Sequence, residues 1–427
     1  MDMRIGFLAF AQAHQHLHWI PAALELARRP GIEVDVLCPS RAGIRLIRRY
    51  DPERRLRILW TPASLVDGLF DVPPRKRVQV LYAWRFPRYR IIVTTESTSA
   101  RLRDFPGFRA ALVRIRHGVG DAATRLDDDR LKTFDLSLVG GEKDRRRLAA
   151  AGLGGESNVV VAGYSKFELL RAPERLFAND RPIALYNPHA RPELSSWPRL
   201  GEELVRAMEG LPAWNFIVAP HVKLQVGPQV RSSAENVRID RGSIQSIDMT
   251  YTEAASVYIG DASSQVYEFL RTPRPCIFVN AHRVDWRRRE DFAHFALGQV
   301  IERPEQLGPA LARARAVQSQ YAPLQRAAMA DSIAESSEPA SKRQAEAVLA
   351  LARRSGAHPE EEPRVVTTPS VDARSHLPAA ACDAAMPPKQ TMGHRFLEAD
   401  FAAMPRGPGA DRVGDPELGQ EIHSPGG

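Results

Sequence analysis

Short, unbroken apolar runs alternate with segments of helical periodicity along most of this 427-residue chain, and this alternation limits the fold more than any other feature. Runs such as Arg4–Phe10 and Ile32–Leu37 are apolar at nearly every position, so they predict strands buried on both faces. Between them, Ile20–Arg29 has helical spacing and ends at Pro30-Gly31. Such an order predicts a parallel, doubly wound α/β sheet.

The same alternation restarts near residue 170 and predicts a second sheet of the same kind. Further strands of the first sheet are expected at Leu56–Trp60, Arg90–Thr94, Ala111–Ile115 and Leu136–Val139. Those of the second sheet are expected at Pro182–Tyr186, Asn215–Ala219, Val237–Ile239, Val257–Gly260 and Cys276–Val279. We therefore expect two domains, residues 1–165 and 166–355, and a helix over Ser341–Arg353 that packs back across their junction.

After about Gly356 the composition changes to Pro, Gly, Ala, Ser and charged residues, and the periodicity is lost. A segment of this kind cannot bury enough apolar surface to offset its chain entropy. Residues 356–427 are therefore predicted to be a disordered tail.

The formal net charge of +8 favours partners that carry phosphates, such as a nucleotide or an anionic lipid surface. No nucleic acid is expected, because the arginine clusters lack a nucleic-acid-binding motif with stacking aromatics. Basic residues over Arg85–Arg90, interleaved with Trp84, Phe86 and Tyr89, suit an anionic membrane surface or simply a solvated loop. No apolar run is long enough to span a bilayer. The predicted location is the cytoplasm, with a peripheral position at the inner membrane face left open.

Several common classes of enzyme and site lack their signatures here. There is no Walker A sequence, no GxSxG nucleophile elbow and no GxGxxG after the first strand. Cys38, Cys276 and Cys382 are far apart and form no CxxC pair, so neither a disulfide framework nor a zinc site is indicated.

The strongest local signal lies after the predicted strand Val257–Gly260, where Asp261, Ser263 and Ser264 precede a helix. Serine hydroxyls and the free N–H groups of a helix start can cradle a phosphate. The competing interpretation is an ordinary helix cap formed by Asp261 or Ser263. Both interpretations stay open from the residues alone.

Three other predicted strands end in polar groups. His117-Gly118 and Asp121 follow a strand of the first domain, while His221 and Lys223 follow one of the second. Asn187 and His189 end the first strand of the second domain. Because ligands bind at the carboxyl ends of strands in such sheets, we expect the two sets to face each other across a cleft. A histidine there suits general-base chemistry.

Histidines also occupy alternate positions after the first strand, at His14, His16 and His18. No carboxylate or cysteine completes a ligand set, and helical geometry would keep the three apart, so no metal is expected. We expect His14 or His16 to contact a substrate, with plain surface exposure as the alternative.

Taken in order, these segments resemble the CDP-glycerol:poly(glycerophosphate) glycerophosphotransferases, the teichoic-acid-type polymer transferases. His117-Gly118 resembles an HG motif of that family, Gly163-Tyr164-Ser165-Lys166 a GYPK junction, and Asp261–Ser264 a DYSS motif with Glu268 at the following acidic position. His221 matches the histidine of an HP-type motif. His189 stands where the family has the threonine of YxPT.

The resemblance implies a GT-B fold, with two Rossmann-like domains facing across a cleft. It implies transfer of glycerol phosphate, or a related polyol phosphate or sugar, from a CDP-activated donor to a polymeric or lipid-linked acceptor of the cell envelope. It implies no nicotinamide or flavin cofactor. The resemblance implies that His117 acts as general base and that His221 stabilises the donor pyrophosphate. It also implies that Ser263 and Ser264 bind phosphate oxygens and that Glu268 binds the ribose hydroxyls. Asp261, Asn187 and Lys223 are predicted on the donor side, and His14, His16, Gly118 and Asp121 on the acceptor side.

Two other functions compete with this one. One is a UDP-sugar glycosyltransferase or a UDP-GlcNAc 2-epimerase, although the several carboxylates of an epimerase cannot be placed. The other is a non-catalytic GT-B module that binds a nucleotide or a polymer.

Overall fold

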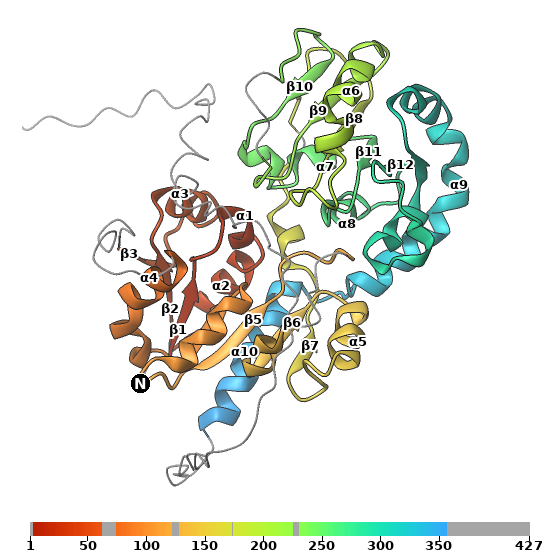
Figure 1. Cartoon of the computed structure of the whole chain (residues 1–427). Coiled ribbons are helices and arrows are strands. Elements are labelled where there is room, and N and C mark those ends of the chain that lie inside the picture. Colours follow the sequence, from red (N-terminus) through yellow and green to blue (C-terminus); the bar gives the residue numbers. More distant parts are fainter. Residues whose placement is uncertain (1–2, 62–73, 122–127, 173, 225–229, 357–427) are drawn as a thin grey trace, which may run out of the picture.

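Two parallel β-sheets, each covered by helices, make up the computed structural model of this protein (Figure 1). The structure describes residues 3–61, 74–121, 128–172, 174–224 and 230–356. The predicted tail therefore lies outside the described residues, apart from its first residue, Gly356.

The first sheet has the strand order β3-β2-β1-β4-β5-β6-β7, and all neighbouring strands are parallel. Its strands are β1 (Met3–Leu8), β2 (Ile32–Cys38), β3 (Arg57–Trp60), β4 (Ile91–Thr94), β5 (Ala111–Ile115), β6 (Leu136–Val139) and β7 (Val159–Val161). Its α-helices are α1 (Ala13–His16), α2 (Ile20–Ala27), α3 (Arg41–Tyr50), α4 (Pro74–Tyr82) and α5 (Glu142–Ala150).

The second sheet repeats this plan with the order β10-β9-β8-β11-β12-β13, again all parallel. Its strands are β8 (Ile183–Asn187), β9 (Asn215–Val218), β10 (Val237–Ile239), β11 (Val257–Gly260), β12 (Cys276–Val279) and β13 (Gln299–Ile301). The helices that follow in the chain are α6 (Trp197–Glu209), α7 (Thr250–Ala254), α8 (Gln265–Phe269), α9 (Leu307–Ser332) and α10 (Ala340–Gly356). In both sheets the strand order reverses beside the first strand, which is where doubly wound folds bind ligands.

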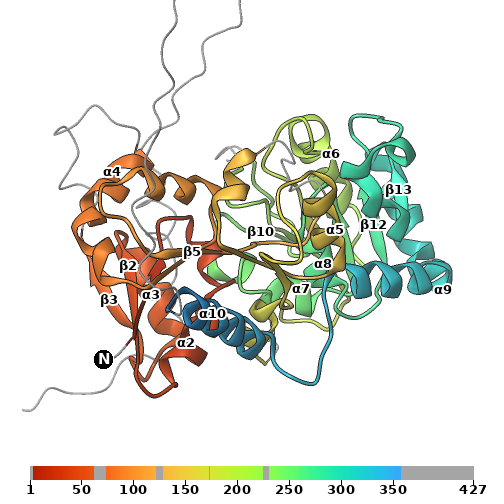
Figure 2. The ribbon, with the colours of Figure 1, turned by 90° about the horizontal axis from the view of Figure 1, so that it is seen from below.

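Helix α10 returns from the second sheet and packs against α2 of the first (Figure 2). Its Ala345, Val348 and Leu351 are buried in the core on that face of the first sheet. Hydrogen bonds that hold it include those from Gln344 Nε2 to the Gly163 carbonyl and from Arg90 Nη2 to the Ala352 carbonyl. The last described helix therefore completes the core of the first sheet.

The predicted strands agree with the observed ones, but β7, β13 and α5 were not predicted. The two strands have only three residues each. Helix α5 buries only Asp144 and Leu148, so it has no apolar stripe. Helical spacing over Ser246–Ala255 predicts one short helix, but the structure has a short 3-10 turn (Ile244–Ser246) followed by α7, because Met249 between them adopts a left-handed φ of 72°.

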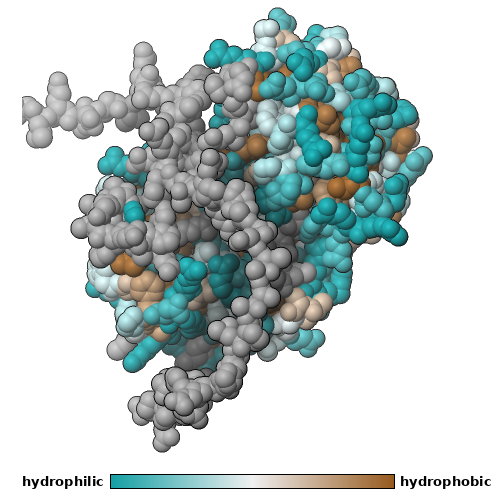
Figure 3. Space-filling view, viewed as in Figure 1, coloured by the Kyte–Doolittle hydropathy of each residue, from teal (hydrophilic) through white to brown (hydrophobic). Residues whose placement is uncertain are grey.

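Among the described residues, none of the helices is both long and apolar enough to cross a membrane. On the face shown in Figure 3, hydrophilic side chains predominate over the coloured surface, and apolar ones form small scattered areas.

Candidate active site

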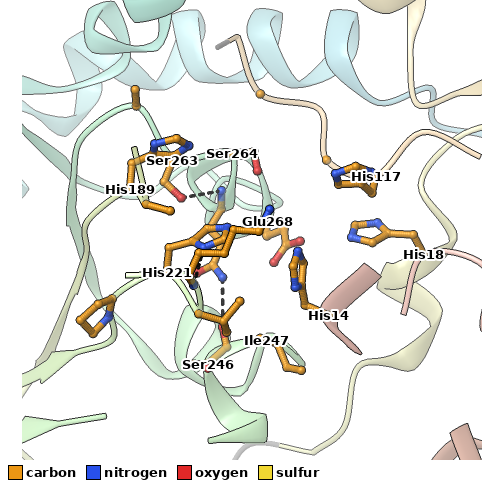
Figure 4. Close-up of a pocket in the computed structure, with 18 of the residues that line it drawn as sticks. His14, His18, His117, His189, His221, Ser246, Ile247, Ser263, Ser264 and Glu268 are labelled. Atoms are coloured by element: carbon orange, nitrogen blue, oxygen red, sulfur yellow. Dashed lines mark hydrogen bonds between the residues drawn. The ribbon is translucent and has the colours of Figure 1, made fainter. Parts of the chain in front are cut away.

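A cavity of about 350 Å³ lies between the two sheets, at the carboxyl ends of their strands. The loops that follow β1, β5, β8, β9 and β11 all contribute to its wall. Five histidines line it: His14, His18, His117, His189 and His221 (Figure 4). The polar residues at the strand ends of the two sheets therefore face each other across the cavity, as predicted.

The ring of His117 is oriented by a backbone carbonyl, because its Nδ1 lies 3.1 Å from the oxygen of Thr95. A carbonyl only accepts hydrogen bonds, so Nδ1 carries the proton and Nε2 keeps its lone pair. Burial, with the charges of Arg114 and Arg116, lowers the pKa of His117 to about 3. The ring is thus neutral near pH 7 and able to accept a proton at Nε2.

His14 and His18 share one face of the helical turn after β1, whereas His16 lies on the other. His14 and His18 line the cavity, and the ring of His18 lies edge-on to His117 with the centroids 6.2 Å apart. His16 is buried against Trp19, with ring centroids 5.7 Å apart, and beside Gly43 of α3. Residues four apart on a helix are neighbours. Of the two histidines predicted to contact a substrate, His14 lines the cavity and His16 does not, whereas helical spacing places His18 on the same face as His14.

The opposite wall presents His189 and His221 from the loops after β8 and β9. The backbone N–H of Arg191 donates to His189 Nδ1, and that of Lys223 to His221 Nδ1, both at 3.1 Å. Burial lowers the pKa of His221 to about 3 and that of His189 to about 4. In the neutral ring the proton must then reside on Nε2, so these two histidines are hydrogen-bond donors.

Ser263 and Ser264 form the turn between β11 and α8. Ser263 Oγ donates to Oδ1 of Asn187 at 2.7 Å, and Asn187 Nδ2 donates to the Ala219 carbonyl at 2.6 Å. The N-cap residue of α8 is Ser264, which makes no side-chain cap hydrogen bond, but Ser263 Oγ accepts from the backbone N–H of Gln265, the first residue of α8, at 3.4 Å. Helix α8 has only five residues. The hydroxyls and backbone of the turn, more than a helix dipole, are the groups available to an anion.

The two domains approach each other closely at this turn. Gly118 has a φ of 75°, and a Cβ atom there would lie 3.1 Å from Ser264 Oγ. At Gly120 a Cβ atom would lie only 2.6 Å from the Cβ of Ser264 and 2.9 Å from its Cα. The loop after β5 therefore needs glycine for two reasons, a left-handed backbone at one position and a backbone approach without side chain at the other.

Two buried aspartates tie the loops together behind the cavity wall. Asp261 accepts hydrogen bonds from the backbone N–H groups of His189 and Ser196, at 2.8 and 2.6 Å. Burial raises the pKa of Asp261 to about 6. Asp121, from the first domain, accepts from Tyr267 OH of the second at 2.8 Å and lies 3.2 Å from Nδ1 of His294. Burial opposes its ionisation, but His294 and Lys143 hold the pKa of Asp121 below its usual range.

Glu268 on α8 joins the second domain to the segment that leaves the first. Its Oε1 accepts from Lys166 Nζ and from Tyr164 OH, each at 2.6 Å. The ion pair is nearly buried, with 4% of the Lys166 side chain and 7% of the Glu268 side chain exposed. All three residues line the cavity.

The predicted site residues thus fall into two groups. Eight of them line the cavity: His14, His117, Gly118, His221, Lys223, Ser263, Ser264 and Glu268. The other four are buried and do not line the cavity: His16, Asn187, Asp121 and Asp261. The lining residues outside that predicted set include His18, His189, Tyr164 and Lys166. Within the described part of the chain, no three His, Cys, Asp or Glu side chains are placed to hold a metal ion.

Comparison with known proteins identifies the architecture. No protein-family model matches the sequence, and a search of curated proteins gives no match. Among solved structures, the wall teichoic acid polymerase TagF aligns with a TM-score of 0.59 and 12% identity, over 83% of this chain and 90% of that one. A UDP-GlcNAc 2-epimerase from Neisseria meningitidis aligns with a TM-score of 0.52 and 11% identity, over 83% of this chain and 100% of that one. The glycosyltransferase of kitacinnamycin aligns with a TM-score of 0.51 and 14% identity, over 82% of this chain and 99% of that one.

The chain has a GT-B fold. At these identities the likeness establishes the architecture alone. The predicted two-domain α/β fold is confirmed, since both sheets are parallel and helix-covered and the cavity lies between them.

Proposed function

We propose that this protein is a transferase that moves glycerol phosphate, or a related polyol phosphate, from a CDP-activated donor to a polymeric or lipid-linked acceptor. One observation carries the proposal. The cavity sets a neutral histidine with a free Nε2 lone pair, His117, opposite two N–H-donating histidines, His189 and His221. A base facing anion-binding groups suits attack of a hydroxyl on an activated phosphate.

The reaction assigns a task to each wall. His117 Nε2 takes the proton of the acceptor hydroxyl as the acceptor oxygen forms its bond to the transferred phosphorus. The bond from that phosphorus to the bridging oxygen breaks, and CMP leaves with the electron pair. Ser264, Lys223 and His221 stabilise the developing charge on the donor side. Glu268, which Lys166 holds in place, accepts hydrogen bonds from the ribose hydroxyls of the donor.

Titration calorimetry with CDP, CMP, UDP and UMP is the first test. Preferential binding of CDP or CMP, lost in Ser264→Ala or Glu268→Ala, supports the proposal. Preference for UDP would instead favour a sugar-nucleotide enzyme of the same fold. An epimerase and a glycosyltransferase are among the structurally similar proteins. Binding without turnover of any donor favours a non-catalytic module.

The lining of the cavity argues against the epimerase alternative. Among the described residues that line it, Glu268 is the single carboxylate, and it is already paired with Lys166 at 2.6 Å. The several carboxylates of an epimerase site therefore have no counterparts there.

For location, we propose the inner face of the cytoplasmic membrane, reached through Trp84. Its side chain is 59% exposed, and the Arg85 and Arg88 guanidinium carbons lie 4.0 and 5.2 Å from its ring centroid. Phe86 and Tyr89, predicted to take part, are instead buried in the core of the first domain. An amphipathic aromatic flanked by cations suits an anionic interface.

Flotation with vesicles that contain or lack anionic lipid tests this location. Trp84→Ala should lower the bound fraction on anionic vesicles several-fold. Leu324→Ala is the matched control, because Leu324 is a similarly exposed apolar side chain on α9. Equal flotation of wild type on neutral and anionic vesicles would remove the membrane from the proposal.

A further inference from the structure

The same four-residue pattern, Pro-His-x-basic, occurs at the ends of two adjacent strands. Pro188–Arg191 follows the end of β8, and Pro220–Lys223 follows the end of β9. The two strands pair in parallel, so the two patterns lie side by side at the same edge of the sheet. Both histidines line the cavity.

The two patterns also fold alike. In each, the histidine Nδ1 accepts the backbone N–H two residues later, at 3.1 Å, as the side-chain oxygen does in an Asx turn. The turns are joined to each other, because the His221 N–H donates to the Pro188 carbonyl at 3.0 Å. The first turn is also fixed to the buried Asp261 through the His189 N–H at 2.8 Å. The two rings are thus held in place before any ligand arrives.

This arrangement fixes the chemical character of the rings. With Nδ1 occupied as an acceptor, each neutral ring carries its proton on Nε2. The ring centroids are 5.9 Å apart and the ring planes are tilted by 56°, so two donors stand close together on one wall. Burial keeps both rings neutral by lowering their pKa values, and Lys223 and, for His189, Arg191 act in the same direction. Rigid donors aimed at a ligand site stabilise an anion without having to reorganise.

We propose that the twin turns form a diphosphate site, in which His189 and His221 each donate an Nε2–H hydrogen bond to one of two linked phosphate groups. This inference rests on the proposed function and deepens it, because it assigns the diphosphate of the activated donor to two rings and makes His189 a specificity-determining residue. A monophosphate engages one ring only. The same chemistry binds inorganic pyrophosphate, which provides a probe that lacks the nucleoside.

Calorimetry with pyrophosphate and phosphate tests the site, using paired substitutions at each histidine. In His189→Asn and His221→Asn the carboxamide oxygen can still accept the backbone N–H and preserve the turn, but the donor in the cavity is lost. In His189→Gln and His221→Gln the longer side chain returns an N–H donor near the position of Nε2. Hydrogen bonds to charged groups are strong enough that each loss should weaken pyrophosphate binding by about tenfold or more.

The expected result is a wild-type preference for pyrophosphate over phosphate, abolished by either Asn variant and largely restored by the Gln variants. Equal affinities of the wild type for the two anions, or Asn variants that keep the preference, would overturn the twin site even if nucleotides bind. CDP, CMP, UDP and UMP are titrated in parallel. A pyrophosphate preference without any nucleotide binding refutes the proposed function and leaves the twin site standing. A wild type that binds none of these ligands refutes both.

Discussion

Gly120 and Ser264 come from different domains, yet their main chains approach so closely that a Cβ atom on Gly120 would lie 2.9 Å from the Ser264 Cα. Gly120→Ala should therefore push the two loops apart and lower the free energy of unfolding by about 1–3 kcal/mol, the usual cost of overpacking. Transferase activity should fall as well, because the two walls of the cavity separate. Urea unfolding and activity assays measure both effects.

Gly155→Ala is the matched control for that substitution, since a Cβ atom at Gly155 meets nothing within 4 Å. It should change neither stability nor activity appreciably. If Gly120→Ala behaved like this control, the close contact between the domains would not exist in solution.

His117→Ala should lower kcat by about 100-fold or more, the typical contribution of a general base, while nucleotide affinity changes little. The reason is that His117 lies on the wall formed by the first domain, with Nδ1 held by the Thr95 carbonyl, which leaves Nε2 for the proposed role of base. Single-turnover kinetics and calorimetry separate the two quantities. His282→Ala removes a histidine outside the cavity and should leave kcat unchanged. Near-wild-type turnover in His117→Ala would exclude this residue as the base.

Lys166→Met should destabilise the protein by about 3 kcal/mol, because it leaves Glu268 as an unpaired charge in a buried position. Adding Glu268→Gln removes that charge, so the double variant should be less destabilised than the sum of the single variants. Chemical unfolding of all four proteins gives the coupling energy. The exposed pair Arg175–Asp180 provides the comparison, since removing Arg175 should cost at most about 1 kcal/mol. Additive effects at Lys166 and Glu268 would mean that the pair does not join the domains.

Acidification should destabilise the ligand-free protein, because the five cavity histidines are buried in neutral form. Burial lowers the pKa of each in the folded state, to about 3 for His117 and His221, whereas the unfolded chain titrates near 6.5. Below that value the unfolded state binds more protons, so the free energy of unfolding falls with pH between about 6.5 and 4. Each histidine contributes up to about 1.4 kcal/mol per pH unit in that window.

Unfolding curves at several pH values between 8 and 5 measure this slope, which should be flat above about pH 7.5. His14→Gln removes one of the five groups and should reduce the slope by about one proton. A stability that stays constant from pH 7.5 to 5 would show that the cavity histidines are charged or solvated in the folded protein.

The sequence predicted the sheets well because fully buried parallel strands are apolar at almost every position, as Val257–Gly260 illustrates. It also indicated which polar residues gather around the cavity, because polar residues after such strands must lie at one edge of each sheet. It could not separate residues that line the cavity from those that support them. Asn187 and Asp261 are polar and lie at or just after strand ends, but their side chains are already hydrogen-bonded within the protein. Asn187 accepts from Ser263 Oγ, and Asp261 accepts from the backbone N–H of Ser196.

Contacts between the domains were not predictable, because they join residues far apart in sequence. Nothing near Asp121 indicates that Tyr267 and His294 will meet its carboxylate, and nothing near Lys166 indicates Glu268. The repeated Pro-His-x-basic pattern, in contrast, is visible in the sequence. The two copies of the pattern can act together only because β8 and β9 are neighbours in the sheet, and the sequence does not give that strand order.

Helix α10 has a consequence for how the chain is completed during synthesis. The first sheet leaves the ribosome before the second, but the apolar side of α2 stays open until Ala345, Val348 and Leu351 arrive. The second sheet lies between them in the chain and can close first, since domains generally fold as units. The earlier half must therefore wait for the later one, and a nascent chain that stalls after α9 would present an uncovered core to chaperones.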